Sequence, residues 1–115
     1  MAELIVFEKP TCTTCRQLAS ILEEMGVDAE SIDYQVFGLT EAQVREIVAK
    51  TGLTVRDLLR TREPEYQELV KGKDLSDDAI VALIVKHPVL LQRPVVIRGN
   101  RAVLARPAER VRELF

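Results

Sequence analysis

The order of apolar segments near the N-terminus most constrains the fold of this chain. Leu4 to Phe7 form a short apolar run before a Lys-Pro step, which predicts a buried strand that leads into a loop. Apolar side chains then recur at helical spacing, at Leu18, Ile21, Leu22 and Met25. They predict a helix that Gly26 can end, and a second β-like stretch follows at residues 31–36. This order favours a parallel pair of strands with a right-handed crossover.

Residues 40–87 contain helical signals and no strand signal. Thr40 and Gln43 have the spacing of a capping box at the start of one helix. Thr54 can cap a second, shorter helix, and Ser76 begins a third that has acidic residues in its first turn. We therefore predict a helical block after the second strand.

The C-terminal part returns to strand signals. The segment PVVIRGNRAVLA, residues 94–105, predicts a hairpin in which Gly99 and Asn100 supply the positive φ values of a two-residue turn. Pro107 occupies a favoured first helical position, and apolar residues up to Phe115 give a short terminal helix its buried face. The whole layout is strand, helix, strand, helical block, hairpin and helix.

Composition limits the kinds of protein that this chain can be. With 115 residues, 47% of them hydrophobic and 30% charged, it suits one domain that buries a core without disulfides. A net charge of −2 argues against a broad basic surface for nucleic acid. No segment approaches the roughly 20 apolar residues of a membrane span, and the N-terminus lacks the regions of a secretory signal. We expect a cytoplasmic monomer that binds neither nucleic acid nor membranes directly.

The segment KPTCTTCRQ, residues 9–17, carries the strongest chemical signal. Cys12 lies where the first predicted helix begins, beside unpaired backbone N–H groups and the positive end of the helix dipole. Both favour the thiolate, which is the nucleophilic form of cysteine. Lys9 and Arg16 are close in sequence and add positive charge. We predict a functional role for Cys12.

Cys15 allows more than one interpretation. The second thiol of a CxxC pair can attack a disulfide on the first, which makes a dithiol cycle available. It can instead pack one turn into the helix as a small buried residue. A zinc site would need two further ligands, but the chain has no other cysteine and a single histidine, His87, which can cap a helix before Pro88. We predict no metal site.

Arginines form the second signal. Arg60, Arg93 and Arg106 each lie at a predicted element boundary, where a scaffold presents side chains to a site. A guanidinium fork binds phosphate-like oxyanions and carboxylates. If the three guanidinium groups converge on Cys12, they form an oxyanion site with a nucleophile. The alternative is that each of them is an ordinary arginine solvated at the surface. The spacing in sequence does not distinguish the two.

Several motifs together resemble the glutaredoxin-dependent arsenate reductases and their relatives, including the Spx regulators. They are KPTCTTCRQ, LLRTREPEYQEL at residues 58–69, HPVLLQRPVVI at residues 87–97 and LARP at residues 104–107. The resemblance spans nearly the whole chain. It implies an α/β, thioredoxin-like fold with a mixed four-stranded sheet and a helical insertion at about residues 40–87, in one domain over residues 1–115.

The resemblance also implies roles for the site residues. Cys12 matches the nucleophilic cysteine, and the arginines that match the arsenate-binding set are Arg60, Arg93 and Arg106. Pro94 matches a proline that is typically cis in thioredoxin-like folds. The implied substrate is arsenate, which the Cys12 thiolate attacks with no bound cofactor. Glutathione with glutaredoxin then resolves the adduct, or Cys15 forms a disulfide with Cys12 that thioredoxin or glutaredoxin reduces.

Two departures from the reductases keep an alternative open. CTTCR is similar to the CxxC switch of Spx, which implies a redox-sensing transcriptional regulator that binds RNA polymerase. Glu8 stands where many reductases have a histidine, four positions before the cysteine. Arg106, in contrast, matches the third arginine of the reductases, which Spx proteins lack. A third possibility is a general thiol oxidoreductase that has lost activity toward arsenate.

Overall fold

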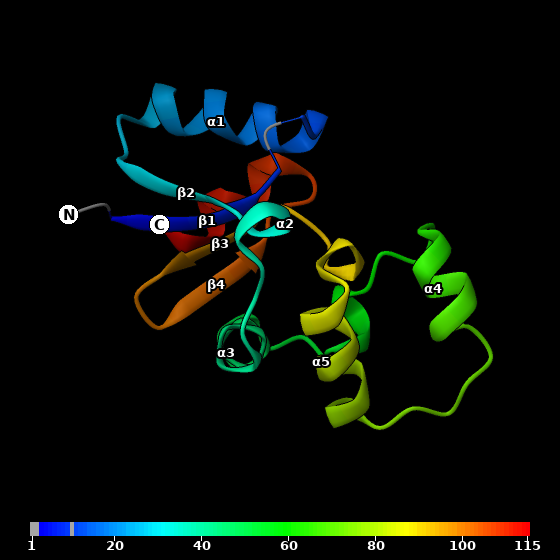
Figure 1. Cartoon of the computed structure of the whole chain (residues 1–115). Coiled ribbons are helices and arrows are strands. Elements are labelled where there is room, and N and C mark those ends of the chain that lie inside the picture. Colours follow the sequence, from blue (N-terminus) through cyan, green and yellow to red (C-terminus); the bar gives the residue numbers. More distant parts are fainter. Residues whose placement is uncertain (1–2, 10) are drawn as a thin grey trace.

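Four strands form one mixed sheet in the order β2-β1-β3-β4 (Figure 1). The computed structural model describes residues 3–9 and 11–115. The strands are β1 (Leu4–Glu8), β2 (Ala29–Asp33), β3 (Val95–Arg98) and β4 (Arg101–Leu104). β1 pairs in parallel with β2 and antiparallel with β3, and β3 pairs antiparallel with β4. The predicted mixed four-stranded sheet, with its N-terminal parallel pair, is confirmed.

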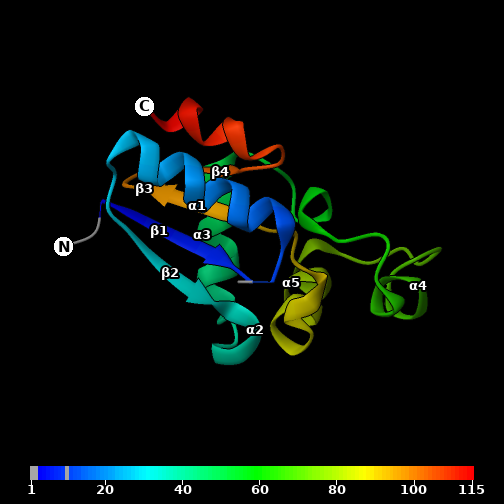
Figure 2. The same cartoon turned by 90° about the horizontal axis from the view of Figure 1, so that it is seen from above.

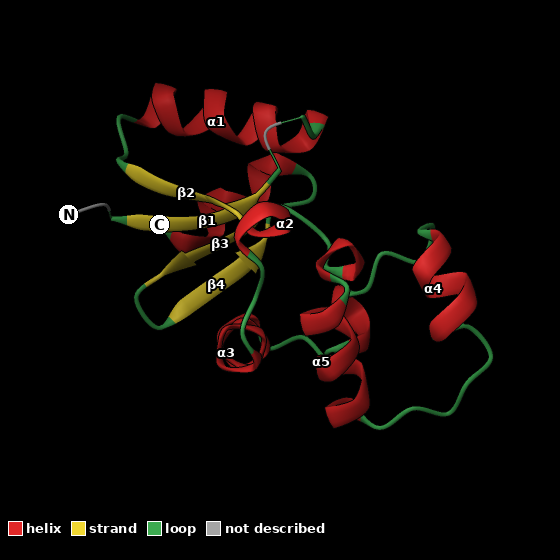
Figure 3. Ribbon diagram, viewed as in Figure 1, coloured by secondary structure: helices red, strands yellow, loops and turns green. Residues whose placement is uncertain are grey.

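Helices cover both faces of this sheet. On one face α1 (Thr13–Met25) and the 3-10 helix η3 (Ala108–Leu114) lie side by side, as the view from above shows (Figure 2). α3 (Glu41–Thr51) packs against β4 on the other face. The remaining helices lie near or beyond the end of the sheet (Figure 3). They are α2 (Tyr34–Phe37), η1 (Arg56–Leu58), α4 (Pro64–Leu69), α5 (Asp77–Lys86) and η2 (Pro88–Leu90).

Alternation along the strands divides the core into two clusters. Leu4 and Val6 of β1 pack with α1 and η3, whereas Phe7 packs with the helices of the opposite face. β3 alternates in the same way, with Val96 toward α1 and Val95 toward the other cluster. Because successive side chains of a strand point to opposite faces, both faces of β3 need apolar residues. Neither cluster contains a buried charged residue.

Local helix signals behave as the sequence predicts. Gly26 ends α1 in the left-handed region at φ 68°, a conformation that costs glycine little. The Thr40 hydroxyl accepts from the backbone N–H of Gln43 at 3.1 Å, and the Gln43 side chain accepts from the backbone N–H of Thr40 at 2.9 Å. Ser76 caps α5 by accepting from the N–H of Ala79 at 3.2 Å. These caps fix where the helices begin and end.

The second strand differs from its prediction. It covers Ala29–Asp33 rather than residues 31–36, and the chain then turns into the short helix α2. The Asp33 carboxylate accepts from the N–H of Gln35 at 3.2 Å and starts this turn. Tyr34 is fully buried, and its hydroxyl donates to the Leu91 carbonyl at 2.7 Å. This distant contact overrides the β propensity of the segment.

Two C-terminal details also differ from their predictions. Gly99 has a φ of 59°, but among the described residues positive φ occurs only at glycines, so Asn100 does not share it. One positive φ at the first turn residue is typical of a type II′ hairpin rather than type I′. Pro107 is the N-cap of η3 rather than its first helical residue. The helical block also contains α4, which begins at Pro64 and was not predicted.

No helix in the described ranges is both long enough and apolar enough to cross a membrane. Helices and 3-10 turns fill residues 41–90 between β2 and β3. A single domain with an insertion at about residues 40–87 stays a prediction.

Tyr34→Phe is expected to lower the free energy of unfolding by about 1–3 kcal/mol, because the buried Leu91 carbonyl loses the donor at 2.7 Å. Urea unfolding followed by circular dichroism measures this change. Tyr66→Phe is the matched control, since Tyr66 is only half-buried. Equal stability of the Tyr34→Phe variant and the wild type would contradict the prediction.

Candidate active site

Cys12 is the N-cap residue of α1. Its backbone is extended, with φ −77° and ψ 129°, and its carbonyl accepts the first helical hydrogen bond from the N–H of Arg16 at 3.0 Å. The N–H of Cys12 donates to the Lys9 carbonyl at 2.9 Å, which folds the loop after β1. The half-buried thiol therefore stands at the N-terminus of a 13-residue helix, as predicted.

The surroundings of Cys12 lower the pKa of its thiol. Burial alone raises this pKa, and it is the largest single influence. The backbone N–H and the thiol of Cys15 act in the opposite direction, as does the guanidinium of Arg93. The net effect is a pKa below the ordinary value for cysteine. Partial burial with donors and a cation nearby is the environment of a reactive cysteine.

Cys15 has the opposite character. It is one turn into α1, only 2% exposed, and it packs as a small core residue. The pKa of its thiol is raised to about 12, chiefly by burial and also by Cys12 and Glu8, while a backbone hydrogen bond at Lys9 acts in the opposite direction. The pKa of the Glu8 carboxyl is itself raised by burial. Cys15 is therefore mostly protonated at neutral pH, and its thiol contributes to the lowered pKa of Cys12.

Arg93 faces the cysteine from the loop before β3. Its guanidinium lowers the pKa of Cys12, and it opposes the burial that raises the pKa of Tyr34 to about 12. The Nε and Nη1 atoms of Arg93 are buried, and no acceptor in the described ranges satisfies them. Buried donors normally have a partner. Two N–H groups of this guanidinium are thus left without an acceptor beside the Cys12 thiol.

Two loops bring the arginines near one another. The N–H of Arg60 donates to the Leu90 carbonyl at 2.7 Å, and the N–H of Gln92 donates to the Leu58 carbonyl at the same distance. The Gln92 side chain also donates to the Asp57 carbonyl at 2.8 Å. These bonds hold the loop after η1 against the loop that carries Arg93.

Arg106 reaches the same region from the end of β4. Its Nη1 donates to the Arg93 carbonyl at 2.9 Å. The N–H of Ala105 donates to the carbonyl of Pro94 at 2.9 Å, which holds the two segments together. Pro94 is buried, and the Arg93–Pro94 peptide bond is cis, as the resemblance implies.

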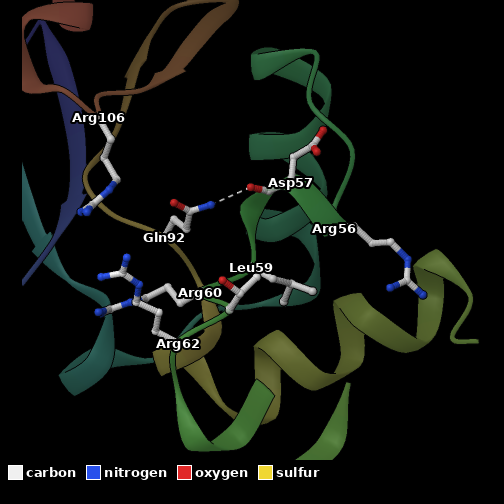
Figure 4. Close-up of a pocket in the computed structure, with 8 residues that line it drawn as sticks. Arg56, Asp57, Leu59, Arg60, Arg62, Gln92 and Arg106 are labelled. Carbon is white, nitrogen blue, oxygen red and sulfur yellow. Dashed lines mark hydrogen bonds between the residues drawn. The ribbon is translucent and has the colours of Figure 1, made fainter. Parts of the chain in front are cut away.

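An open pocket of about 510 Å³ lies beside these loops (Figure 4). Its lining residues are Arg56, Asp57, Leu59, Arg60, Thr61, Arg62, Gln92 and Arg106. Figure 4 shows the guanidinium groups of Arg60, Arg62 and Arg106 turned toward the same side of the pocket, whereas Arg56 points away. Four arginines and one aspartate make this surface strongly positive. The arrangement suits an anionic ligand.

The predicted residues therefore fall into two connected groups. Cys12, Cys15 and Arg93 lie together, while Arg60 and Arg106 line the neighbouring pocket. The Arg106–Arg93 hydrogen bond connects the two groups. Arg60 is half-buried and pairs with Glu63 at 3.0 Å, which occupies part of its fork.

Six of the eight residues that line the pocket were not predicted as site residues, and Arg62 and Gln92 are two of them. Arg62 stands two positions after Arg60, and Gln92 directly precedes Arg93. Their proximity to predicted site residues is the only signal that could have found them. His87 is the C-cap of α5, in agreement with its predicted capping role. Within the described part of the chain, no group of three histidine, cysteine, aspartate or glutamate side chains could hold a metal ion.

Comparisons with known proteins agree with this architecture. A model of the ArsC family matches residues 7–114. The arsenate reductase of Neisseria meningitidis is 34% identical over 113 residues, which cover 96% of this chain and 97% of that protein. The arsenate reductase of Escherichia coli strain K12 is 30% identical over 116 residues, which cover 100% of this chain and 82% of that protein.

A solved structure extends the agreement to the fold. The arsenate reductase from Vibrio cholerae superposes with a TM-score of 0.94 at 31% identity, and the match covers 99% of this chain and 98% of that one. The mixed sheet with its flanking helices is the thioredoxin-like fold of these reductases. By sequence and by structure, this chain belongs to the ArsC family, the family of arsenate reductases.

Proposed function

We propose that this protein is a thiol-dependent arsenate reductase in which Cys12 is the nucleophile. The observation that carries the proposal is the buried guanidinium of Arg93, which lies beside a thiol of lowered pKa and has two unsatisfied N–H groups in the described structure. A cation that stabilises the thiolate can at the same time bind the oxygens of an oxyanion. Arsenate is such an anion, and related proteins are named arsenate reductases.

The first chemical step forms a sulfur–arsenic bond. Arsenate binds to Arg93 with Arg106 and Arg60 at the edge of the pocket, and the Cys12 thiolate attacks arsenic. One arsenic-bound oxygen takes up protons and leaves as water. Arsenic remains in the +5 state in the resulting thiol ester. The arginines counter the negative charge on the oxygens while the bond forms.

The second step transfers two electrons to arsenic. A second thiolate attacks the sulfur of Cys12, and the sulfur–arsenic bond breaks with its electron pair left on arsenic. Arsenic leaves as arsenite in the +3 state, while the two sulfurs are oxidised to a disulfide. Thiol–disulfide exchange with further thiol then restores Cys12.

We propose that the second thiol comes from glutathione, with glutaredoxin closing the cycle, rather than from Cys15. Burial, rather than the neighbouring Cys12 thiol, is the largest cause of the raised pKa of Cys15. A thiol with a pKa of about 12 is almost entirely protonated at neutral pH. Cys15 then serves Cys12 as a hydrogen-bond donor.

Cys15→Ser is expected to keep glutathione-coupled turnover within about twofold, because a serine hydroxyl still donates toward Cys12 and the attacking thiol comes from outside. Steady-state arsenite formation with glutathione and glutaredoxin measures this. Cys15→Ala is the matched variant. It removes the donor, and the pH at which Cys12 becomes alkylated should rise. Loss of turnover in the serine variant would place Cys15 in the redox cycle.

The activity itself is tested by incubating the purified protein with arsenate, glutathione and glutaredoxin. Arsenite that appears in proportion to the protein supports the proposal. A protein that exchanges disulfides but forms no arsenite would instead be a general thiol oxidoreductase.

We further propose that the protein acts in the cytoplasm as a monomer without a bound cofactor. Two free cysteines, one of which needs to stay reduced for catalysis, fit a reducing compartment. The regulator that binds RNA polymerase is not proposed, because no comparison specifically supports it.

A further inference from the structure

We infer that Arg62 binds a carboxylate of the small thiol that reduces the Cys12 adduct. This inference rests on the proposed function, and it assigns to the pocket a second ligand besides the oxyanion. The pocket has a volume of about 510 Å³. Pockets of roughly 300–1,000 Å³ accommodate organic molecules, and a single tetrahedral oxyanion leaves most of such a volume unfilled.

The other arginines of the pocket already have contacts. Arg56 turns away and donates to the Leu75 carbonyl at 2.9 Å. Arg60 pairs with Glu63 at 3.0 Å, and Arg106 donates to the Arg93 carbonyl at 2.9 Å. Arg62 is exposed, and within the described residues its side chain forms neither an ion pair nor a hydrogen bond. Its whole fork therefore faces the pocket unpaired.

Among the described residues, no carboxylate forms an ion pair with Arg62. The only acidic residue among those lining the pocket, Asp57, has its side chain turned away from the guanidinium groups (Figure 4). One carboxylate oxygen of Asp57 accepts from the N–H of Thr54 at 3.0 Å. Glu63, next in sequence to Arg62, is engaged by Arg60. The guanidinium of Arg62 is therefore free to bind an anion from outside the protein.

The position of Arg62 separates its role from that of Arg93. Arg93 influences the Cys12 thiol directly, whereas Arg62 lines the neighbouring pocket together with Arg106. The hydrogen bond from Arg106 to the Arg93 carbonyl connects this pocket to the group around Cys12, so in the inferred arrangement the attacking thiol approaches the Cys12 sulfur from the pocket. A peptide thiol with carboxylates at its ends, such as glutathione, can put its sulfur at Cys12 while one carboxylate pairs with Arg62.

Steady-state kinetics of Arg62→Ala tests this inference. We expect the KM for glutathione to rise about tenfold, which corresponds to the loss of one charge-assisted contact. The KM for arsenate and kcat should stay within about twofold. Arg62→Lys should recover part of the affinity, because it keeps the charge without the fork. Arg112→Ala, an exposed arginine on η3, is the matched control and should leave all constants unchanged.

A thiol without a carboxylate sharpens the test. With 2-mercaptoethanol in place of glutathione, wild type and Arg62→Ala should have equal rates. An equal loss with both thiols would overturn the inference. So would a KM for arsenate that rises as much as the KM for glutathione, because Arg62 would then bind the oxyanion.

Direct binding separates this inference from the proposed function. S-methylglutathione cannot react, and calorimetry should show that it binds wild type about tenfold more tightly than Arg62→Ala. Arg62-dependent binding in a protein that forms no arsenite would leave the subsite standing and the arsenate reaction refuted. Arsenite formation with no dependence of glutathione binding on Arg62 would refute the subsite alone.

Discussion

Cys12→Ser is expected to reduce the rate of arsenite formation by on the order of a thousandfold or more, to the background of the assay. Serine occupies nearly the same space, but at neutral pH its hydroxyl is not ionised and it forms no disulfide. Both proposed steps need the sulfur of Cys12, first as nucleophile and then as the atom that the second thiol attacks. The measurement is arsenite formed per protein with saturating glutathione and glutaredoxin.

The control for Cys12→Ser is the folded state of the variant. Cys12 is an N-cap without a side-chain capping hydrogen bond. Serine is a favourable N-cap, so the unfolding midpoint in urea should not fall. A variant that is equally stable and inactive supports the nucleophile. Turnover above one tenth of the wild-type rate would exclude Cys12 as the essential thiol. A tenfold lower rate corresponds to an activation free energy that is higher by only about 1.4 kcal/mol.

Local signals explain why much of the fold could be predicted. The capping box at Thr40, the N-cap at Ser76 and the glycine that ends α1 all act within one helical turn. Such interactions depend on neighbours in sequence, so a single chain is enough to identify them. The order of strands and helices then leaves few topologies for the sheet.

Contacts between residues far apart in sequence explain why the predictions for the second strand and for the hairpin turn differ from the structure. Residues 34–37 have a β-like composition, yet Tyr34 turns inward to donate to Leu91, and the segment becomes α2. The hairpin turn was placed correctly, but its type depends on a backbone angle that Asn100 does not adopt. Pairwise contacts of this kind cannot be derived from local propensity.

In the candidate site, too, some features follow from neighbours in sequence and others depend on distant contacts. The position of Cys12 at a helix entrance follows from its neighbours in sequence. The proximity of Arg93 to Cys12 depends on the pairing of β1 with β3. The place of Arg93 at an element boundary suggested a site residue, but only the motif resemblance connected it with Cys12. Arg62 had no signal of its own, since an exposed arginine in a loop resembles any solvated arginine. Only the pocket distinguishes it.

Arg93→Ala is expected to lower kcat/KM for arsenate by about 10²–10³-fold, the range seen when one preorganised donor to a reacting oxyanion is removed. The guanidinium lowers the pKa of Cys12 and presents two buried N–H groups beside it, so the variant loses the thiolate and the oxyanion contact together. Arg93→Lys should lose less, since it keeps the charge without the bidentate fork.

The pH dependence of alkylation separates these two contributions. Iodoacetamide reacts with the thiolate, so the alkylation rate of Cys12 rises with pH through the pKa of its thiol. In the wild type this midpoint should lie below the ordinary value of 9.0, and Arg93→Ala should move it upward, because the variant lacks a cation that favours the charged form. Arg112→Ala, which removes an exposed arginine elsewhere, should leave the midpoint unchanged. A midpoint that does not move in Arg93→Ala, together with unchanged kcat/KM, would remove Arg93 from the site. Arg106 and the pocket are connected to the Cys12 thiol through Arg93. If Arg93 had no effect on Cys12, nothing would show that the pocket takes part in the reaction of the thiol.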